Sequence, residues 1–349
     1  MKKLIRPKKL QKGDTIAAIS LSWGGPGTIP SKYNYGVRQL EDFLDVKVKP
    51  TRHALKDAQW LHDNPKARAD DLMEAFLDPD IKAIISTIGG SDSIRLLPYI
   101  DLNVIAQNPK IFMGYSDTTI SHFACYKAGL SSFYGPSIMA GFGENGGLHP
   151  YMAQSVKKIL CNSSTPGIWE PDTSGWVSEQ HSWDDDSYLD IPRPLNNPVQ
   201  PLYLQGDAKV KGRLIGGCLE VLEFLKGTDY WPSLNEWEGC VLFIETSEEA
   251  PSPEFLIRVL RNYAAQGILQ RLSGVLFGRP GGLKSDEKFK SYDDALLQVI
   301  TKECSLDNLH IVTHLAFGHT DPMHVLPYGA MVEIDSSSET ITFTEGAVL

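Results

Sequence analysis

A serine stands where an apolar, strand-like run gives way to a helix-like one, in the segment KIFMGYSDTTISHF (110–123). Asp117, Thr118 and Thr119 follow Ser116, and these residue types favour the first turn of a helix. The spacing predicts that Ser116 lies on a strand-to-helix turn, which in an open α/β sheet faces the ligand crevice. Such a turn exposes the hydroxyl and lets the Asp117 N–H stabilise an oxyanion. The pattern is G-x-S-x-T rather than G-x-S-x-G, so a helix-capping role for the serine stays open.

A nucleophilic serine needs a base and a group that orients the base. Glu245 closes the run GCVLFIET directly after apolar residues that should be buried, where an unpartnered carboxylate is costly. Its alternative role is to cap the next helix. His319 follows Gly318 at the end of another apolar run, HIVTHLAFGHTDP. Serine, acid and histidine then follow one of the chain orders in which catalytic triads occur.

A metal site is the competing interpretation of the histidines, because His310, His314, His319 and His324 are close in sequence. A zincin helix needs glutamate after its first histidine, but Ile311 stands there and IVTHLAF favours a strand. The five cysteines are widely spaced without a C-x-x-C pair, so neither a disulfide framework nor a thiolate zinc site is indicated. We therefore expect no metal.

Two glycine-rich segments lie at predicted loops. In STIGGSDSIRLLPYID (86–101), Gly89 and Gly90 let the backbone approach a ligand, and their N–H groups are candidates for a second oxyanion donor. SWGGPGTIP (22–30) has neither the phosphate-binding G-K-[ST] pattern nor the dinucleotide G-x-G-x-x-G pattern. We interpret it as a turn near the crevice.

The elements that must position these residues follow from the apolar patterning. Runs rich in Ile, Val and Ala alternate with amphipathic stretches up to residue 142, which predicts parallel strands covered by helices. Expected strands cover 14–21, 81–87, 110–115 and 131–135, and expected helices cover 33–43, 67–77, 93–99 and 117–128. After a Pro-, Trp-, Ser- and Asp-rich stretch, further strands are expected at 209–217, 239–246, 272–278 and 310–318, an antiparallel hairpin at 330–343, and helices at 219–225, 253–266 and 292–303.

The length of 349 residues is too great for one ordinary hydrophobic core. We predict the α/β class with two domains. The N-terminal domain (1–162) has a mostly parallel sheet flanked by helices and carries the serine. An irregular crossover linker (163–205) leads to a mixed α/β C-terminal domain (206–349), which carries the glutamate and the histidine.

Composition and charge exclude several classes of partner. The net charge is −10, and the one basic cluster (1–12) lacks interleaved aromatic residues, which argues against nucleic-acid binding. The early apolar run TIAAISL is too short for a signal peptide, and no stretch approaches the length of a transmembrane helix. An odd number of scattered cysteines fits a reducing compartment. We expect a cytoplasmic protein that binds neither nucleic acid nor membrane.

The sequence resembles the LD-carboxypeptidase and microcin C self-immunity serine peptidases over nearly its whole length. The resemblance is carried, in the family's order, by TIGGSDSIRLLPYID, NPKIFMGYSDTT, FYGPSIMAGFGE, GRLIGGCLEVL, VLFIETSE and FGHTDPMHVLPYG. It implies that Ser116 is the nucleophile, His319 the general base and acid, and Glu245 the orienting carboxylate. It further implies oxyanion-hole N–H groups from Gly90 and Asp117, a homodimer, and no metal or organic cofactor.

Substrate choice within the family rests on a few positions. Ile88 precedes the paired glycines where the peptidoglycan-recycling branch has arginine, so the chain is more similar to the microcin-immunity branch, which cleaves an amide between an aminoacyl group and a modified nucleotide. Trp183, in HSWDDD, matches the crossover aromatic residue that stacks on the base, or it pins the loop. Gly89 and Cys218 are the other candidate substrate-binding residues. Cys218 replaces the asparagine of the family's GGN and is alternatively a small core residue.

Three hypotheses follow. The favoured one is a serine peptidase or amidase of the microcin-immunity type, acting on a small peptide or an aminoacyl-nucleotide. The second is an LD-carboxypeptidase that acts on cell-wall tetrapeptides. The third, of another class, is a non-catalytic two-lobed protein that closes on a small ligand. Only the enzymes require Ser116, Glu245 and His319 to converge.

Overall fold

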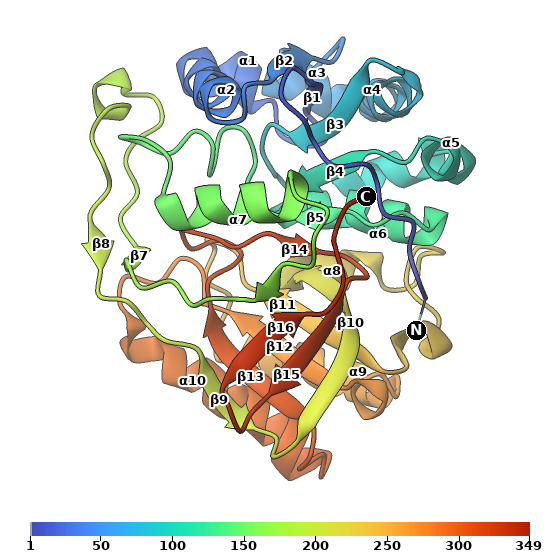
Figure 1. Cartoon of the computed structure of the whole chain (residues 1–349), viewed down its shortest axis with the longest axis vertical. Helices are drawn as coiled ribbons and strands as arrows, with labels where there is room; N and C mark the ends of the chain where they lie inside the picture. Colours follow the sequence, from blue (N-terminus) through green and yellow to red (C-terminus); the bar gives the residue numbers. More distant parts are fainter. Residues whose placement is uncertain (1) are drawn as a thin grey trace.

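Two β-sheets, one formed mainly by each half of the chain, organise the structure. The computed structural model describes residues 2–349. Figure 1 shows the first half, in blue to green, above the second half, in yellow to red, with α7 (Pro150–Leu160) lying across the middle. The predicted α/β class with a parallel first sheet and a mixed second sheet is confirmed.

The first sheet has six strands, five of them parallel. Their spatial order is β14 (Leu326–Pro327), β5 (Phe133–Tyr134), β4 (Ile111–Gly114), β3 (Ile81–Ser86), β1 (Thr15–Ile19) and β2 (Lys47–Pro50). Every residue of β4 is buried, as expected for a strand covered by helices on both faces. The antiparallel strand β14 comes from the C-terminal half of the chain and pairs with β5. The two halves therefore share this sheet.

Helices surround the first sheet. They are α1 (Gly25–Thr28), α2 (Pro30–Leu44), α3 (Ala58–Asp63), α4 (Pro65–Leu77), the 3₁₀-helix η1 (Ser93–Tyr99), α5 (Leu102–Gln107), the 3₁₀-turn η2 (Ser116–Thr118), α6 (Thr119–Ala128) and α7. The expected helix at 93–99 is a 3₁₀-helix with Pro98 inside it, where the missing N–H of proline disfavours an α-helix. The helix expected from residue 117 begins as an α-helix only at Thr119, because the 3₁₀-turn precedes it.

The second sheet has eight strands. In spatial order they are β6 (Gly167–Ile168), β16 (Thr340–Phe343), β15 (Met331–Asp335), β10 (Lys209–Cys218), β11 (Cys240–Glu245), β12 (Gly274–Gly278), β13 (His310–Leu315) and β9 (Leu202–Gln205). The four strands from β10 to β13 are parallel, and the predicted antiparallel hairpin at the end of the chain is formed by β15 and β16. The second sheet is therefore mixed, as predicted.

The helices of the second half are α8 (Leu219–Leu225), η4 (Leu234–Trp237), α9 (Pro253–Ala265), η5 (Leu269–Arg271), η6 (Asp286–Lys288), α10 (Phe289–Leu297) and the π-helix η7 (Gln298–Glu303). Ser252 caps α9 by accepting the Phe255 N–H. The helix expected at 292–303 is thus two elements, α10 followed by η7.

The crossover segment descends along one side of both halves in Figure 1. It forms the short strands β6, β7 (Trp176–Val177) and β8 (Leu195–Asn196), the 3₁₀-turn η3 (Asp186–Tyr188), and finally β9. Strands β7 and β8 pair with each other, whereas β6 and β9 pair with the edges of the second sheet. This segment is therefore anchored to the second sheet at its ends, with the short β7–β8 pair and irregular turns between them.

One apolar core runs through both halves. The Tyr134 ring of the first sheet lies 5.5 Å from the Phe243 ring of the second sheet, which lies 5.1 Å from the ring of Tyr328. The chain ends also pair, since the Leu349 N–H donates to the Pro7 carbonyl at 2.8 Å. Shared aromatic packing of this kind holds the facing edges of the two halves in a fixed relation.

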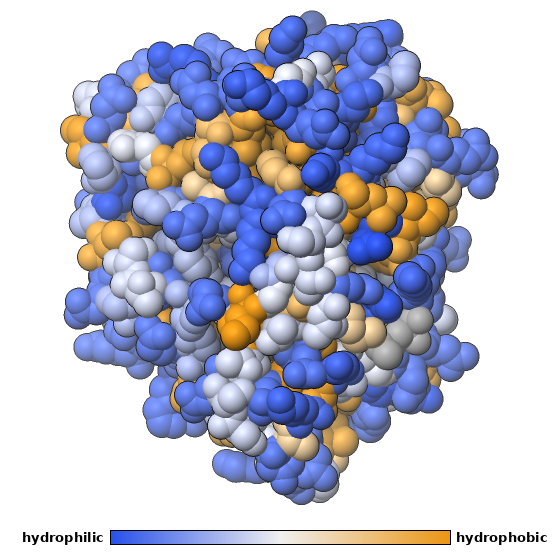
Figure 2. All heavy atoms as spheres, viewed as in Figure 1, coloured by the Kyte–Doolittle hydropathy of each residue, from blue (hydrophilic) through white to orange (hydrophobic). Residues whose placement is uncertain are grey.

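The outer surface is mostly polar on the face drawn in Figure 2, where apolar side chains emerge in separate small patches. Among residues 2–349, no helix combines the length and the apolar character that crossing a membrane requires.

Candidate active site

Ser116 lies on the sharp turn between β4 and α6, and its backbone is strained. Its φ is +61°, in the left-handed region that side chains other than glycine rarely adopt. Such a residue costs on the order of 1 kcal/mol and persists only where its surroundings impose the conformation. The Ser116 N–H donates to the hydroxyl of Tyr134 at 3.1 Å, and the Thr118 N–H closes the turn on the Tyr115 carbonyl at 3.2 Å. The turn has the geometry of a nucleophile elbow.

The glycine loop after β3 packs directly against this serine. A Cβ atom added at Gly89 would lie 2.8 Å from Cβ and 2.9 Å from Oγ of Ser116, and 3.5 Å from the amide nitrogen of Asp117. Gly90 has φ +145°, and a Cβ there would overlap Ser22. The backbone of this loop therefore comes within ligand-binding distance of the serine hydroxyl, which only glycine permits. The oxyanion role of the Gly90 and Asp117 N–H groups stays a prediction.

The buried Asp117 side chain ties the elbow to the same loop. Its Oδ2 accepts the Ser93 N–H at 2.9 Å, and the Ser93 hydroxyl donates to the Asp117 carbonyl at 2.8 Å. Burial raises the pKa of Asp117 above its usual value. These bonds fix the position of η1 and the glycine loop relative to Ser116.

Glu245 ends β11 and is completely buried. Its Oε2 accepts from Nδ1 of His319 at 2.7 Å and from the His319 N–H at 3.2 Å. Its Oε1 accepts from the Tyr134 hydroxyl at 2.5 Å. Three donors thus satisfy a carboxylate that would otherwise be costly to bury. Gly318 has φ +90°, and a Cβ there would lie 2.5 Å from Cγ of Glu245, so only glycine lets the two residues approach.

His319 carries a proton more readily than an ordinary histidine. Burial alone would lower its pKa, but the carboxylates of Glu245, Glu248 and Glu220 outweigh burial and raise it to about 9. Its Nε2 lies 3.2 Å from Oε2 of Glu248, a side chain that is 69% exposed. The ring also packs edge-on against Tyr115, with centroids 4.9 Å apart. In this state the nitrogen that would serve as base pairs with Glu248 rather than with the serine.

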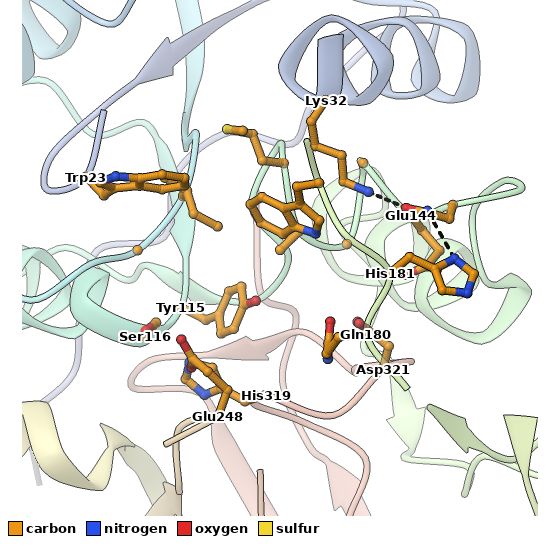
Figure 3. A pocket seen from close by; sticks show the side chains of 18 of the residues that line it. Trp23, Lys32, Tyr115, Ser116, Glu144, Gln180, His181, Glu248, His319 and Asp321 are labelled. Carbon is orange, nitrogen blue, oxygen red and sulfur yellow. Dashed lines mark hydrogen bonds and ion pairs between the residues drawn. The ribbon is translucent and has the colours of Figure 1, made fainter. Parts of the chain in front are cut away.

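A cavity of about 430 Å³ opens beside Ser116 and His319. Figure 3 shows Ser116, His319 and Glu248 gathered at one side of it, with Tyr115 pointing into the space and Lys32 and His181 at the opposite side. Both halves of the chain and the crossover contribute to the lining. Ser116 and His319 therefore border one space between the halves, whereas Glu245 is buried behind His319 and does not line the cavity.

Of the three predicted substrate-binding residues, two line the cavity and one does not. Trp183 and Gly89 line the cavity. Trp23 also lines it, so the segment 22–30 lies near the crevice as predicted. This segment contains the helix α1 rather than a simple turn. Cys218 is buried and lies outside the lining. Its thiol contacts Oε2 of Glu220 at 3.5 Å, and its N–H donates to Thr119 at 3.2 Å. A substrate contact by Cys218 stays a prediction.

A buried charge cluster lies at the end of the cavity away from Ser116, and no sequence pattern predicts it. Arg193 donates from Nε to Oε1 of Glu144 at 2.8 Å and from Nη2 to Oδ2 of Asp321 at 2.6 Å. Burial alone would raise the pKa of the Glu144 carboxyl, but His149 and Arg193 lower it to about 2. These residues are scattered from position 144 to position 321, so no local pattern marks them. The cluster fastens the crossover to both halves.

Lys32 lies in the same wall. Its ammonium donates to Oδ1 of Asn145 and lies 5.4 Å from the centre of the Trp183 ring. Burial lowers the pKa of Lys32 to about 8. The indole is thus held in the cavity wall by a cation–π contact, which orders a side chain on an otherwise irregular loop.

The described residues contain one group that has metal-ligating atoms close together, namely Cys218, Glu245 and His319, whose ligand atoms lie within 4.8 Å of one another. A metal would need a thiolate there, but burial raises the pKa of the Cys218 thiol well above its usual value. Both oxygens of Glu245 already accept hydrogen bonds. This donor set fits a histidine–carboxylate pair better than a metal centre.

The four neighbouring histidines do not form a cluster. His310 bonds to the Ala208 carbonyl at 2.6 Å, His314 to Asp293 at 3.0 Å, and His324 to the Val325 carbonyl at 2.9 Å. Each ring is therefore engaged in its own place, and His319 alone points to the cavity. Among the described residues, these four histidines are therefore not brought together as one ligand set.

The comparisons with known proteins cover nearly the whole chain. Residues 16–135 match the LD-carboxypeptidase N-terminal domain, and residues 211–334 match the LD-carboxypeptidase C-terminal domain. The chain is 31% identical over 342 residues to the microcin C7 self-immunity protein MccF of Escherichia coli, which covers 96% of this chain and 94% of that protein.

Solved structures give the same result. An MccF-like protein from Streptococcus pneumoniae in complex with AMP superposes with a TM-score of 0.86 at 31% identity, covering 95% of this chain and 99% of that one. The microcin C7 self-immunity protein MccF in complex with aspartyl sulfamoyl adenosine superposes with a TM-score of 0.85 at 28% identity, covering 99% and 100%. Both bound molecules contain an adenosine group.

Proposed function

Because the chain belongs to the LD-carboxypeptidase family, we propose that it is a serine hydrolase in which Ser116 attacks an amide carbonyl, His319 is the general base and acid, and Glu245 orients the histidine. The observation that carries the proposal is the 2.7 Å bond between His319 and Glu245, beside a cavity that also exposes the strained Ser116. A protein that only binds a ligand has no need of a strained serine next to an oriented imidazole.

In this mechanism the substrate enters and Glu248 leaves Nε2 of His319, so that the neutral imidazole faces the Ser116 hydroxyl. Oγ forms a bond to the carbonyl carbon while Nε2 takes the hydroxyl proton. The N–H groups of Gly90 and Asp117 stabilise the resulting oxyanion, and each such donor typically contributes roughly 3 kcal/mol. Glu245 stays ionised and stabilises the imidazolium.

The intermediate then collapses. His319 gives its proton to the nitrogen of the leaving amine as the carbon–nitrogen bond breaks, which leaves an acyl ester on Ser116. A water molecule attacks this ester while Nε2 takes one of its protons, and the proton returns to Oγ as the acid product departs. No redox change and no external group are needed for this sequence.

For the substrate we propose an aminoacyl-nucleotide, the class handled by the microcin-immunity branch. The MccF-like neighbours bound to AMP and to aspartyl sulfamoyl adenosine support this choice. Trp183 lies in the cavity wall, ordered by Lys32, where its ring can stack on a base. Gly89 leaves room for the scissile group above Ser116. We retain Cys218, which is buried beside Glu220, as the remaining candidate substrate contact.

An LD-carboxypeptidase activity on cell-wall tetrapeptides is the second candidate, favoured by the name of the family that both halves match. Mass spectrometry of the purified protein with aspartyl sulfamoyl adenosine and with a muropeptide tetrapeptide separates the two. We expect release of aspartate from the first compound. Release of the terminal D-alanine from the second compound alone would replace the proposed substrate.

The same preparation tests hydrolase against binder. A fluorophosphonate probe should label wild-type protein and leave Ser116→Ala unlabelled. AMP binding without labelling or turnover would instead support the binding protein. Homodimer formation and a cytoplasmic location remain predictions.

A further inference from the structure

The hydroxyl of Tyr134 forms hydrogen bonds to two members of the proposed triad, Ser116 and Glu245. Tyr134 lies on β5 of the first sheet and is 1% exposed. Its hydroxyl lies 2.5 Å from Oε1 of Glu245, which belongs to the second sheet. The same oxygen lies 3.1 Å from the amide nitrogen of Ser116. One buried hydroxyl thus joins the backbone of the nucleophile to the carboxylate that orients the base.

The direction of both hydrogen bonds follows from their chemistry. A backbone N–H only donates, so the Tyr134 oxygen accepts from Ser116. The single proton of the hydroxyl is then available to Glu245, which is an acceptor when ionised. Burial, together with the negative charge of Glu245, raises the pKa of Tyr134 well above its usual value. The phenol therefore keeps its proton and remains a donor at neutral and mildly alkaline pH.

We propose that Tyr134 is a positioning residue that couples the conformation of Ser116 to the charge on Glu245, and this inference rests on the proposed function. Its acceptor side satisfies the N–H of a residue held at φ +61°. Its donor side withdraws charge from Oε1 of Glu245 and directs Oε2 to His319. The first effect holds the nucleophile in place, and the second limits how strongly the carboxylate favours the protonated imidazole.

The effect of the Tyr134 hydroxyl on Glu245 can be measured through the pKa of His319, because of the groups that surround the ring. The charged groups that face the ring are the carboxylates of Glu245, Glu248 and Glu220, all of which favour the imidazolium. The neutral groups against it are the Tyr115 ring and the Cys218 thiol. Loss of the phenol proton donor would leave more charge on Glu245. The imidazolium would then be favoured further, and the base would become available only at higher pH.

The test is Tyr134→Phe, which keeps the ring against Phe243 and Tyr115 and removes only the oxygen. Tyr328→Phe is the matched control. Tyr328 is equally buried, packs on the same Phe243 ring, and donates its hydroxyl to the Gly216 carbonyl, away from the triad. Both variants lose one buried hydroxyl from one aromatic cluster, with two hydrogen bonds lost in Tyr134→Phe and one in Tyr328→Phe.

We expect Tyr134→Phe to lower kcat at least tenfold with KM changed less than about twofold, and to move the midpoint of the rise in fluorophosphonate labelling with pH upward. Tyr328→Phe should keep the wild-type kcat and midpoint even if its Tm falls. Replacement of Tyr134 by 3-fluorotyrosine keeps the fold and strengthens the donor, so it should move the midpoint downward. An unchanged midpoint in both Tyr134 proteins, or equal shifts in Tyr134→Phe and Tyr328→Phe, overturns the proposal.

A readout without turnover separates this inference from the proposed function. The ring nitrogens of His319 titrate in the NMR spectrum of wild type and of Tyr134→Phe whether or not the protein is an enzyme. An inactive wild type in which the variant still raises the His319 pKa removes the hydrolase proposal and keeps the coupling. An active wild type in which the His319 pKa is the same in both proteins removes the coupling and keeps the hydrolase.

Discussion

Nε2 of His319 and Oε2 of Glu248 lie 3.2 Å apart, so the proposed base is paired with a surface carboxylate while Nδ1 is paired with a buried one. With its pKa raised to about 9, His319 is almost entirely protonated at neutral pH. About 1% of the ring is neutral at pH 7, since each pH unit changes the ratio tenfold. In the proposed mechanism, activity at neutral pH therefore depends on Glu248 moving away when substrate binds.

The first prediction concerns this pair. Fluorophosphonate labelling of the wild type should rise from pH 7 to about pH 9, because the neutral imidazole is the reactive form. Glu248→Gln removes a charge that favours the imidazolium, so the midpoint should fall by roughly half a unit to one unit. Glu249→Gln, at the next exposed carboxylate, is the control and should leave the midpoint unchanged. A wild-type midpoint near 6.5, unmoved by Glu248→Gln, would contradict the role of the pair.

The strain at Ser116 predicts a difference between two inactive variants. Ser116→Ala and Ser116→Gly should both lose turnover, by about a million-fold if the serine acts as in well-studied hydrolases. Ser116→Gly should be the more stable by about 1 kcal/mol in urea unfolding, because glycine adopts φ +61° without a side-chain penalty. Equal stability of the two would mean that the left-handed conformation is not retained in solution.

Gly89 offers a test of the space above the nucleophile. The methyl group of Gly89→Ala would stand within 3 Å of both Cβ and Oγ of Ser116, where the carbonyl of a substrate must approach. We expect kcat/KM to fall by about a hundredfold or more, in line with the loss of an oxyanion contact. Far-UV circular dichroism and AMP binding serve as controls for folding. Wild-type turnover in this variant would place the reacting carbonyl elsewhere.

Trp183 tests the substrate class. Trp183→Ala should weaken AMP binding by about tenfold, since stacking of a base on an aromatic ring typically contributes roughly 1–3 kcal/mol. The labelling rate of Ser116 by a small fluorophosphonate should stay the same, because the probe does not reach the indole. Trp60→Ala is the control, as Trp60 stacks on His53 outside the cavity. Isothermal titration calorimetry gives the affinities, and an unchanged AMP affinity would favour the loop-pinning role.

The triad candidates were accessible from sequence because each stands at the end of an apolar run. Ser116, Glu245 and His319 follow buried strands or strand-like runs whose Ile-, Val- and Phe-rich composition marks them without any structure. The carboxyl ends of β11 and β13 bring Glu245 and His319 to one edge of the second sheet, whereas Ser116 follows β4 of the first sheet and comes near them only through the packing of the two halves. Strong local patterns therefore predict most strands of both sheets as well as the candidate site residues.

Other features have no local pattern. Strand β2, KVKP, is charged and mostly exposed at the edge of its sheet, so it lacks the apolar run by which strands are recognised. The pairing of Arg193 with Glu144 and Asp321 joins three distant segments. Glu248 belongs to an ordinary polar loop, and nothing in its sequence neighbours indicates that its carboxylate meets His319. Such contacts arise from the tertiary fold.

The placement of β14 in the first sheet limits how this protein can be divided. A fragment that stops before Leu326 would leave the outer side of β5 unpaired, next to the very tyrosine that contacts Ser116 and Glu245. The last residue also pairs with the segment before β1. The C-terminal segment thus connects the two halves. Neither half can therefore be exchanged by recombination or engineering without the other.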